Sequence, residues 1–474
     1  MPPNHRQADL RWIDNPVPEL ARLAWPISVS MLSHSLLTLA DTLFVGRLGA
    51  APLAAVSLGG VASFALLCFG WGLLRAVKVL VAQGVGAGRP SVVPAFLGAG
   101  LLLALGLGAL TAVGGLAAAL VLPGLTADPE TGRLAAGYLS VRSLGAPLVL
   151  VAVALGEARQ GLSDARSPML ANLAANLLNL VLDPLLIFGC GLGVAGAAWS
   201  TVVANAVAAG LLWRFQVQQG PRWALPSAAH VASVVRVGLP LGLQFLLELG
   251  AFTLLVAILA GISNVDLAAH QIALQFCHFS FLPALAVGEA ASVLSAQAVG
   301  ANRDAGVRIV ARHALGLAIA YTGACGLLFA AAARPLAALF TTNEAVRDLA
   351  AQLLYVAAAF QVFDGANIVA RCVLRGAGDV RYPAAVGVLT AWVCTPPLTL
   401  GLGISLGWGA LGGWLGLCAE IVLGAGVLWW RFVKGHWRAA AERSRSALAA
   451  DGAHTLGGSS WRVRTRAQKH LRPD

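Results

Sequence analysis

The sequence predicts an all-α integral membrane protein, with twelve transmembrane helices in two pseudo-symmetric six-helix lobes. Three observations support this fold class: the composition, the recurrence of long apolar runs, and an internal repeat. Of the 474 residues, 58% are hydrophobic and 11% are charged, whereas a soluble domain has roughly 25% charged residues. Because side chains this apolar need lipid around them, we expect the chain to lie in a lipid bilayer.

Apolar runs long enough to cross a bilayer follow one another along almost the whole chain. About 20 apolar residues in a helix cover the roughly 30 Å of hydrocarbon. We predict spans at residues 18–46, 53–80, 92–123, 135–158, 167–189, 194–216, 230–260, 267–298, 308–333, 345–373, 382–404 and 409–433.

The distribution of basic residues predicts the orientation of these spans. If the chain starts inside, most of the 32 Lys and Arg residues fall in inner segments. The exceptions are Arg47, Arg133, Arg142, Arg334 and Arg347. Since Lys and Arg gather in cytoplasmic loops, we expect a plasma (inner) membrane protein with both termini in the cytoplasm. The polar N-terminal segment, residues 1–17, lacks the apolar core of a cleavable signal peptide.

An internal repeat divides the chain into two halves. At an offset of 214 residues the matched pairs are Pro26 with Pro240, Gln83 with Gln297, Gly86 with Gly300 and Arg89 with Arg303. At an offset of 215 they are Gly161 with Gly376, Asp164 with Asp379, and Arg166 with Arg381. Because six helices return the chain to its starting side, the halves form a parallel repeat. We predict an N-lobe at residues 18–216, a cytoplasmic linker at 217–229 and a C-lobe at 230–433.

The excess positive charge gathers in the last segment of the chain. From Arg431 to the end there are ten Lys and Arg residues against three acids, out of a net charge of +11. We therefore expect no nucleic-acid partner. Residues 434–474, rich in Ala, Ser and Arg, have too few apolar side chains to bury a core. We predict that they form a disordered cytoplasmic tail, and that the protein is a monomer.

A polar stripe occupies one face of the fifth predicted span. At about 100° per residue, Asn172, Asn176, Asn179 and Asp183 lie within roughly 60° of arc. Asp183 is the only Asp, Glu, Lys, Arg or His between residues 166 and 214. A lone asparagine is more often an interhelical hydrogen-bonding group. Because a charge in hydrocarbon is costly, four polar groups ending in a carboxylate favour the wall of a cavity.

Other polar side chains inside predicted spans are also candidates. Asp41 lies on the first span, and Glu248 follows Gln244 by one turn on the seventh. Asp364 shares one side of the tenth span with Arg371, and an ion pair between these two is the structural alternative. Further candidates for a substrate cavity, with packing as the alternative, are Gln271, Gln275, His278 and Glu289. Pro26 permits the first span to bend, because proline removes a backbone hydrogen bond.

Motifs for enzymatic chemistry are missing from the sequence. There is no H-E-x-x-H, no Cys/His pair on a shared face and no Gly-rich nucleotide loop. The seven cysteines lie singly in apolar surroundings, without disulfide or metal spacing. We therefore expect neither an enzyme nor an ATP-driven pump, and no cofactor.

Several stretches together resemble one known family. They are LAWPISVSMLSHSLLTLADTLFVGRLG, QGLSDARSP, NLVLDPLLIFG followed by GVAGAAWST, and VFDGANIVARCVLRGAGDVRYP. In this order, and with twelve spans in two halves, they resemble the multidrug and toxic compound extrusion (MATE) family over roughly residues 20–431.

The resemblance implies a secondary antiporter that expels organic, often cationic compounds in exchange for H⁺ or Na⁺ by alternating access. In the N-lobe, the positions that match the family's cation or proton site are Asp41, Asn179, Asp183 and Thr201. In the C-lobe, Glu248 and Asp364 match acids implicated in sodium coupling. Either set could therefore hold Na⁺, and the lobe that couples stays open. Pro26 matches a first-helix proline associated with kinking.

Two other functions remain as alternatives. A lipid-linked precursor flippase of the same broad superfamily would fit the duplicated scaffold, but its cavity should carry more cationic groups to hold pyrophosphate. The charges within the spans are predominantly acidic, which favours cationic or neutral cargo. A membrane-embedded enzyme is the last alternative and has no motif in its support. Neither the cargo nor the choice between H⁺ and Na⁺ follows from the sequence.

Overall fold

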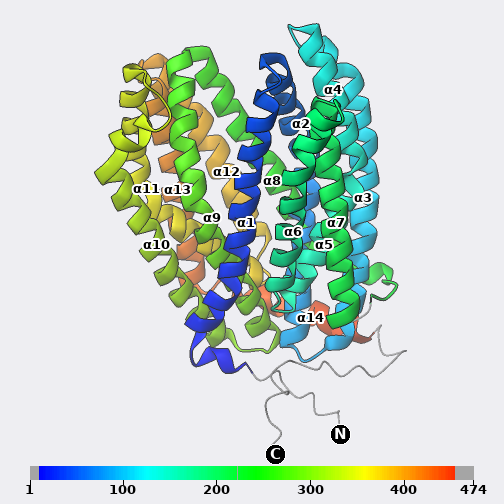
Figure 1. Cartoon of the computed structure of the whole chain (residues 1–474). Helices are drawn as coiled ribbons and strands as arrows, with labels where there is room; N and C mark the ends of the chain where they lie inside the picture. The colour runs from blue at the N-terminus through cyan, green and yellow to red at the C-terminus, as the bar shows by residue number, and fades with distance from the viewer. Residues whose placement is uncertain (1–9, 221–222, 454–474) are drawn as a thin grey trace, which may run out of the picture.

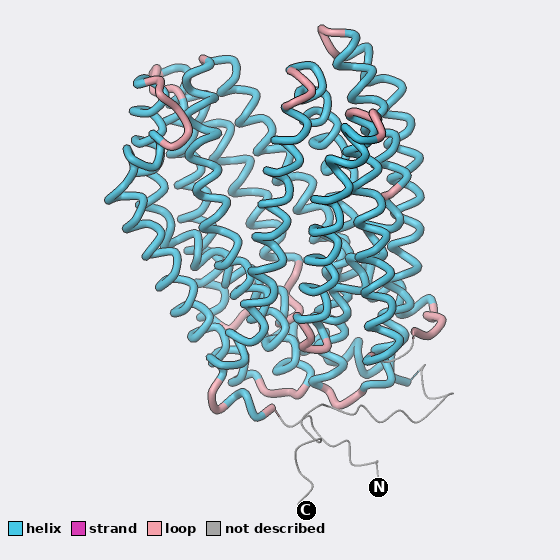
Figure 2. The backbone as a smooth tube through the Cα atoms, viewed as in Figure 1, coloured by secondary structure: helices cyan, strands magenta, loops and turns pink. Residues whose placement is uncertain are grey.

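The computed structural model describes residues 10–220 and 223–453, which form helices joined by short loops, with no strand among them (Figure 2). The first half contains α1 (Pro16–Gly46), α2 (Ala50–Gly86), α3 (Val93–Val121), α4 (Pro129–Leu144), α5 (Ala146–Gly161), α6 (Arg166–Pro184) and α7 (Val194–Gln219). The second half contains α8 (Ala228–Ile262), α9 (Asn264–Gly300), α10 (Asp304–Ala338), α11 (Glu344–Gly376), α12 (Arg381–Leu398), α13 (Ala410–Lys434) and α14 (Arg438–Ala453). Two π-helical turns, η4 (Leu185–Gly189) and η5 (Thr399–Ser405), extend α6 and α12.

The described helices confirm the predicted fold class. Eleven of them are long and apolar enough to cross a membrane, and α4 with α5 forms a twelfth span that bends by 47°. The bend falls at Gly145, and Pro147 follows it in the first turn of α5. Proline suits the first turn of a helix, and in a helix interior it removes a backbone hydrogen bond and favours a bend. By contrast, α1 runs through Pro26 as a single helix.

The helices form two bundles, the N-lobe α1–α7 and the C-lobe α8–α13 (Figure 1). The bundles lie close together at one end and diverge at the other. We call the close end, where α1 begins and α14 lies, the termini side, and the opposite end the far side. Helix α1 packs against α6 of its own lobe and against α9 of the other.

Two glycines related by the repeat bring the lobes together on the termini side. A Cβ atom on Gly86 of α2 would collide with the carbonyl oxygen of Gln297 on α9. A Cβ atom on Gly300 of α9 would collide with the carbonyl oxygen of Gln83 on α2. Gly86 and Gly300 are 214 residues apart, and so are Gln83 and Gln297. The two contacts are therefore equivalent under the internal repeat. Only glycine lets the two helices approach this closely.

The prediction of a disordered tail from residue 434 is wrong for Arg438–Ala453, which form helix α14. Trp437, Ala441 and Leu448 are each at most 4% exposed and pack into the cores of the lobes. These few apolar positions in an alanine-rich run are a weak sequence signal for an amphipathic helix. Residues 454–474 of the predicted tail lie outside the described residues.

Helix α14 contacts both lobes. Ser444 Oγ donates to Gln83 Oε1 of the N-lobe at 2.6 Å. Arg445 Nη1 donates to Asp304 Oδ1 of the C-lobe at 3.0 Å. The helix therefore spans the junction between the lobes on the termini side, where Figure 1 shows it below the two bundles.

Candidate functional site

Two carboxyl groups from different helices meet inside the N-lobe. The Asp183 side chain at the end of α6 is fully buried, and its carboxyl group interacts electrostatically with that of Asp41 on α1. Ser200 Oγ on α7 donates to Asp183. In the amide orientation that satisfies both of its polar atoms, Asn179 donates to Asp41 Oδ1 at 3.2 Å and accepts from the backbone N–H of Thr201 at 3.2 Å. Helices α1, α6 and α7 thus each contribute to one polar cluster.

One buried carboxylate oxygen of this cluster has no donor. Asp183 Oδ2 is buried and has no hydrogen-bond donor among the described residues, although the Asp41 carboxyl group is beside it. Two carboxylates side by side repel one another unless a proton or a cation lies between them. Among the described residues there is no group of three or more His, Cys, Asp and Glu side chains arranged to hold a metal ion.

Ser200 is the site residue that sequence reasoning missed. The adjacent Thr201, which the sequence predicted, contributes its backbone N–H to Asn179 at 3.2 Å, while its hydroxyl group donates to the Ala197 carbonyl oxygen of its own helix at 2.9 Å. Two neighbouring hydroxyl residues cannot both face α6, because successive residues on a helix point about 100° apart. Tyr138 and Arg142 on α4 also interact electrostatically with the Asp41 carboxyl group.

The other half of the polar stripe joins helices. Asn172 Nδ2 donates to Ser30 Oγ on α1 at 2.7 Å, and Asn176 Nδ2 donates to Ser33 Oγ at 2.9 Å. Both asparagines are half-buried. The stripe therefore combines two roles, with interhelical hydrogen bonds toward its start and the carboxyl cluster at its end.

A second polar cluster lies in the C-lobe. Glu248 Oε1 on α8 accepts from Arg371 Nη1 on α11 at 2.8 Å and from Gln244 Nε2 at 3.0 Å. Asp364 is half-buried and interacts electrostatically with Arg371. The ion pair of Arg371 is thus with Glu248, and not with Asp364 as the alternative interpretation had it.

Three predicted cavity residues follow one face of α9. His278 Nε2 lies 3.2 Å from Ser35 Oγ on α1, across the boundary between the lobes. Gln275 is half-buried and Gln271 is exposed. His278 therefore faces the first helix.

The prediction that Glu289 lines a substrate cavity is wrong. Its side chain is 2% exposed, and its carboxylate pairs with Lys78 at 2.6 Å, Arg75 at 3.1 Å and Arg375 at 3.3 Å. Lys78 also pairs with Glu157 at 2.9 Å. Because Arg75, Lys78 and Glu157 belong to the N-lobe, this cluster joins the lobes. Sequence patterns do not indicate this cluster, since its partners come from distant helices.

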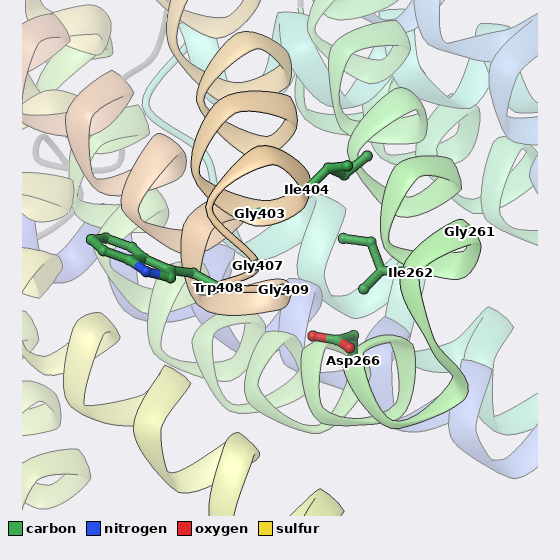
Figure 3. A pocket seen from close by; sticks show the side chains of 8 residues that line it. All are labelled: Gly261, Ile262, Asp266, Gly403, Ile404, Gly407, Trp408 and Gly409. Atoms are coloured by element: carbon green, nitrogen blue, oxygen red, sulfur yellow. The ribbon is translucent and has the colours of Figure 1, made fainter.

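A pocket of about 370 Å³ lies at the far end of the C-lobe, beside Asp266 and a glycine-rich turn (Figure 3). Asp266 Oδ1 accepts from the backbone N–H of Ala410 at 2.6 Å, and Asp266 Oδ2 accepts from Ser263 Oγ at 2.5 Å. Asp266 therefore caps the start of α13 and fixes the turn that precedes it. The predicted site residues do not line this pocket.

Comparisons with known proteins agree with the duplicated helical fold. The family model described as MatE matches residues 26–185 and 240–400, one copy in each lobe. Probable multidrug resistance protein NorM of Rhodopseudomonas palustris is 32% identical over 431 residues, 86% of this chain and 90% of that protein. Its namesake from Deinococcus radiodurans is 33% identical and covers 87% and 94%.

Solved structures show the same architecture. The eukaryotic MATE transporter AtDTX14 superposes with a TM-score of 0.83 at 19% identity, covering 92% of this chain and 99% of that one. An outward-facing multidrug resistance MATE family transporter superposes with a TM-score of 0.80 at 23% identity, covering 91% and 96%.

The helical spans, the family match and the NorM relatives together define a multi-pass membrane transporter, and not an enzyme. The chain belongs to the MatE family.

Proposed function

We propose that this chain exports organic, cationic compounds in exchange for H⁺ or Na⁺, as a secondary multidrug antiporter. The observation that carries the proposal is the meeting of the Asp41 and Asp183 carboxyl groups inside the N-lobe. The names of the NorM relatives, multidrug resistance proteins, support drug-like cargo. In this proposal the coupling ion and the cationic cargo compete for these carboxyl groups.

Competition follows from the charges of the pair. Two like charges about 4 Å apart repel by roughly 4 kcal/mol at an effective dielectric constant near 20. A proton, a sodium ion or an organic cation would each remove this repulsion. Because only one of them is needed at a time, binding of the coupling ion releases the cargo, and exchange is obligatory without direct contact between them.

Alternating access would operate between the two lobes. We propose that the termini side is cytoplasmic, that the protein works as a monomer in the plasma (inner) membrane, and that the closed termini side corresponds to an outward-facing state. Opening toward the cytoplasm then has to break the ion pairs of Glu289 with Arg75 and Lys78. It must also separate the glycine contacts of α2 and α9.

Efflux from proteoliposomes tests this function. The purified protein is reconstituted with a fluorescent organic cation inside, and efflux is followed under a proton gradient and, separately, under a sodium gradient. We expect saturable efflux that one of the gradients accelerates. Unsaturable flux that responds to neither gradient would indicate a channel and would contradict the proposal.

A further inference from the structure

Arg371 lies among the acidic side chains of the C-lobe. Arg371 Nη1 donates to Glu248 Oε1 at 2.8 Å, and Arg371 Nε donates to Asn367 Oδ1 at 2.9 Å. The side chains of Arg371 and Glu248 are 18% and 27% exposed. Two partners on two helices therefore hold the guanidinium group in one place.

The space for this ion pair is provided by a glycine on a third helix. A Cβ atom on Gly387 of α12 would collide with Glu248 Oε1 and would lie 3.2 Å from Arg371 Nη2. A larger residue at this position would require the Glu248 carboxylate to move from its present place. Helix α12 therefore packs directly against the ion pair at Gly387.

The positive charge of Arg371 interacts with three acids of the C-lobe. Besides Glu248, it interacts electrostatically with Asp364 and with Glu420 on α13. Glu420 Oε2 additionally accepts from Thr395 Oγ1 at 2.6 Å. Because a guanidinium group keeps its proton in proteins, the cluster always contains one fixed positive charge.

The N-lobe has no equivalent of this charge. In the register of the repeat, offset by 215 residues, Gly156 on α5 occupies the position of Arg371. Arg142 influences Asp41 electrostatically, but the ion pairs among the described residues include neither Asp41 nor Asp183. The two lobes therefore differ in whether their acids already have a cationic partner.

We propose that Arg371 is a tethered cation that occupies the C-lobe acid cluster in place of a transported ion. This inference rests on the proposed antiport, and it assigns the coupling ion to Asp41 and Asp183 of the N-lobe. A sodium ion about 4 Å from the guanidinium group would be disfavoured on the order of 10³-fold at a dielectric constant near 20. Glu248 consequently binds Na⁺ only when the arginine is removed.

Sodium-specific stabilisation of the purified protein in detergent tests the proposal. The midpoint of thermal unfolding is compared in NaCl and in KCl of equal concentration, because a ligand that binds the folded state raises it. The variants are Glu248→Gln, Arg371→Gln, Arg371→Lys and the double variant Arg371→Gln with Glu248→Gln.

In Arg371→Gln, the midpoint of thermal unfolding should be about 2 °C or more higher in NaCl than in KCl, at a sodium concentration well above the dissociation constant of the site. Arg371→Lys keeps the charge and should gain none. The double variant should lose the gain, because Glu248 supplies the site. If the wild type shows a sodium-specific rise in its unfolding midpoint, the rise should also be seen in Glu248→Gln and should be absent in Asp183→Asn.

A sodium-specific rise in the wild type that Glu248→Gln abolishes would overturn the proposal, and so would a folded Arg371→Gln variant that gains none. If Arg371→Gln does not fold, the wild type still tests the proposal: no sodium-specific rise, or one that persists in Glu248→Gln, supports it, and a rise that Glu248→Gln abolishes overturns it. The result is independent of transport. A protein that moves no organic cation under any gradient would refute the antiport, while the stabilisation experiment would still show whether Arg371 excludes Na⁺.

Discussion

Lys78 on α2 and Glu289 on α9 form a 2.6 Å ion pair that joins the two lobes of the transporter. Both side chains are 2% exposed, so neither charge has water to compensate it. A buried ion pair contributes little net stability, but removing one partner leaves the other charge uncompensated. The pair therefore makes the closed termini side sensitive to single substitutions.

Glu289→Gln is expected to destabilise the protein by about 3–5 kcal/mol, because Arg75, Lys78 and Arg375 lose a shared counter-charge. Chemical or thermal unfolding in detergent measures the change. As a control, Glu344→Gln removes an exposed partner of Arg347 and should cost at most about 1 kcal/mol. Equal effects of the two substitutions would contradict a special role for the buried cluster.

Gly86→Ala should open the termini side, because the added methyl group meets the Gln297 carbonyl oxygen of the other lobe. Overpacking of this kind costs about 1–3 kcal/mol. Distances between spin labels placed on the two lobes at the termini side should lengthen. Gly60→Ala on the same helix has no atom within 4 Å of the new Cβ and should leave them unchanged; longer distances in both variants would refute the explanation.

Trp437→Ala should detach or weaken α14, since the indole ring is fully buried and its Nε1 donates to the Phe432 carbonyl oxygen at 3.1 Å. The expected loss is about 3–5 kcal/mol of unfolding free energy. The control is Trp223→Ala, at a residue that is 49% exposed, where a change within about 0.5 kcal/mol is expected. An unchanged unfolding midpoint for Trp437→Ala would show that α14 does not hold the lobes.

Ser200→Ala should slow gradient-driven efflux at least about tenfold, because a hydrogen bond to a charged group contributes roughly 1.5–3 kcal/mol. Thr201→Val should have a smaller effect, since the Thr201 hydroxyl group bonds its own helix. Initial efflux rates from proteoliposomes, normalised to the amount of reconstituted protein, measure both. A larger loss in Thr201→Val would mean that Thr201, and not Ser200, serves the carboxyl pair.

Local patterns in the sequence predicted the fold and much of the N-lobe cluster. Hydropathy located every span, because crossing a bilayer requires about 20 apolar residues in a row. Helical periodicity placed Asn179 and Asp183 on one face, and the structure brings Asp41 beside them. These features depend on residues close together in the chain or on the duplicated scaffold.

Features that depend on helix rotation and on distant partners could not be predicted. Whether Ser200 or Thr201 faces α6 depends on how α7 is turned about its axis. Glu289 looked like an isolated acid because its partners come from α2 and α11. Likewise, the structural alternative joins Arg371 to Asp364 on its own helix, whereas its ion pair is with Glu248 on α8.

The central claim is that Asp41 and Asp183 couple the exchange. The most direct measurement is efflux of an organic cation from proteoliposomes, under the gradient that drives the wild type, in Asp41→Asn and in Asp183→Asn. We predict that both variants insert and fold as the wild type does but lose gradient-driven efflux. Near-normal gradient-driven efflux in both variants would contradict the claim and move the coupling site out of the N-lobe.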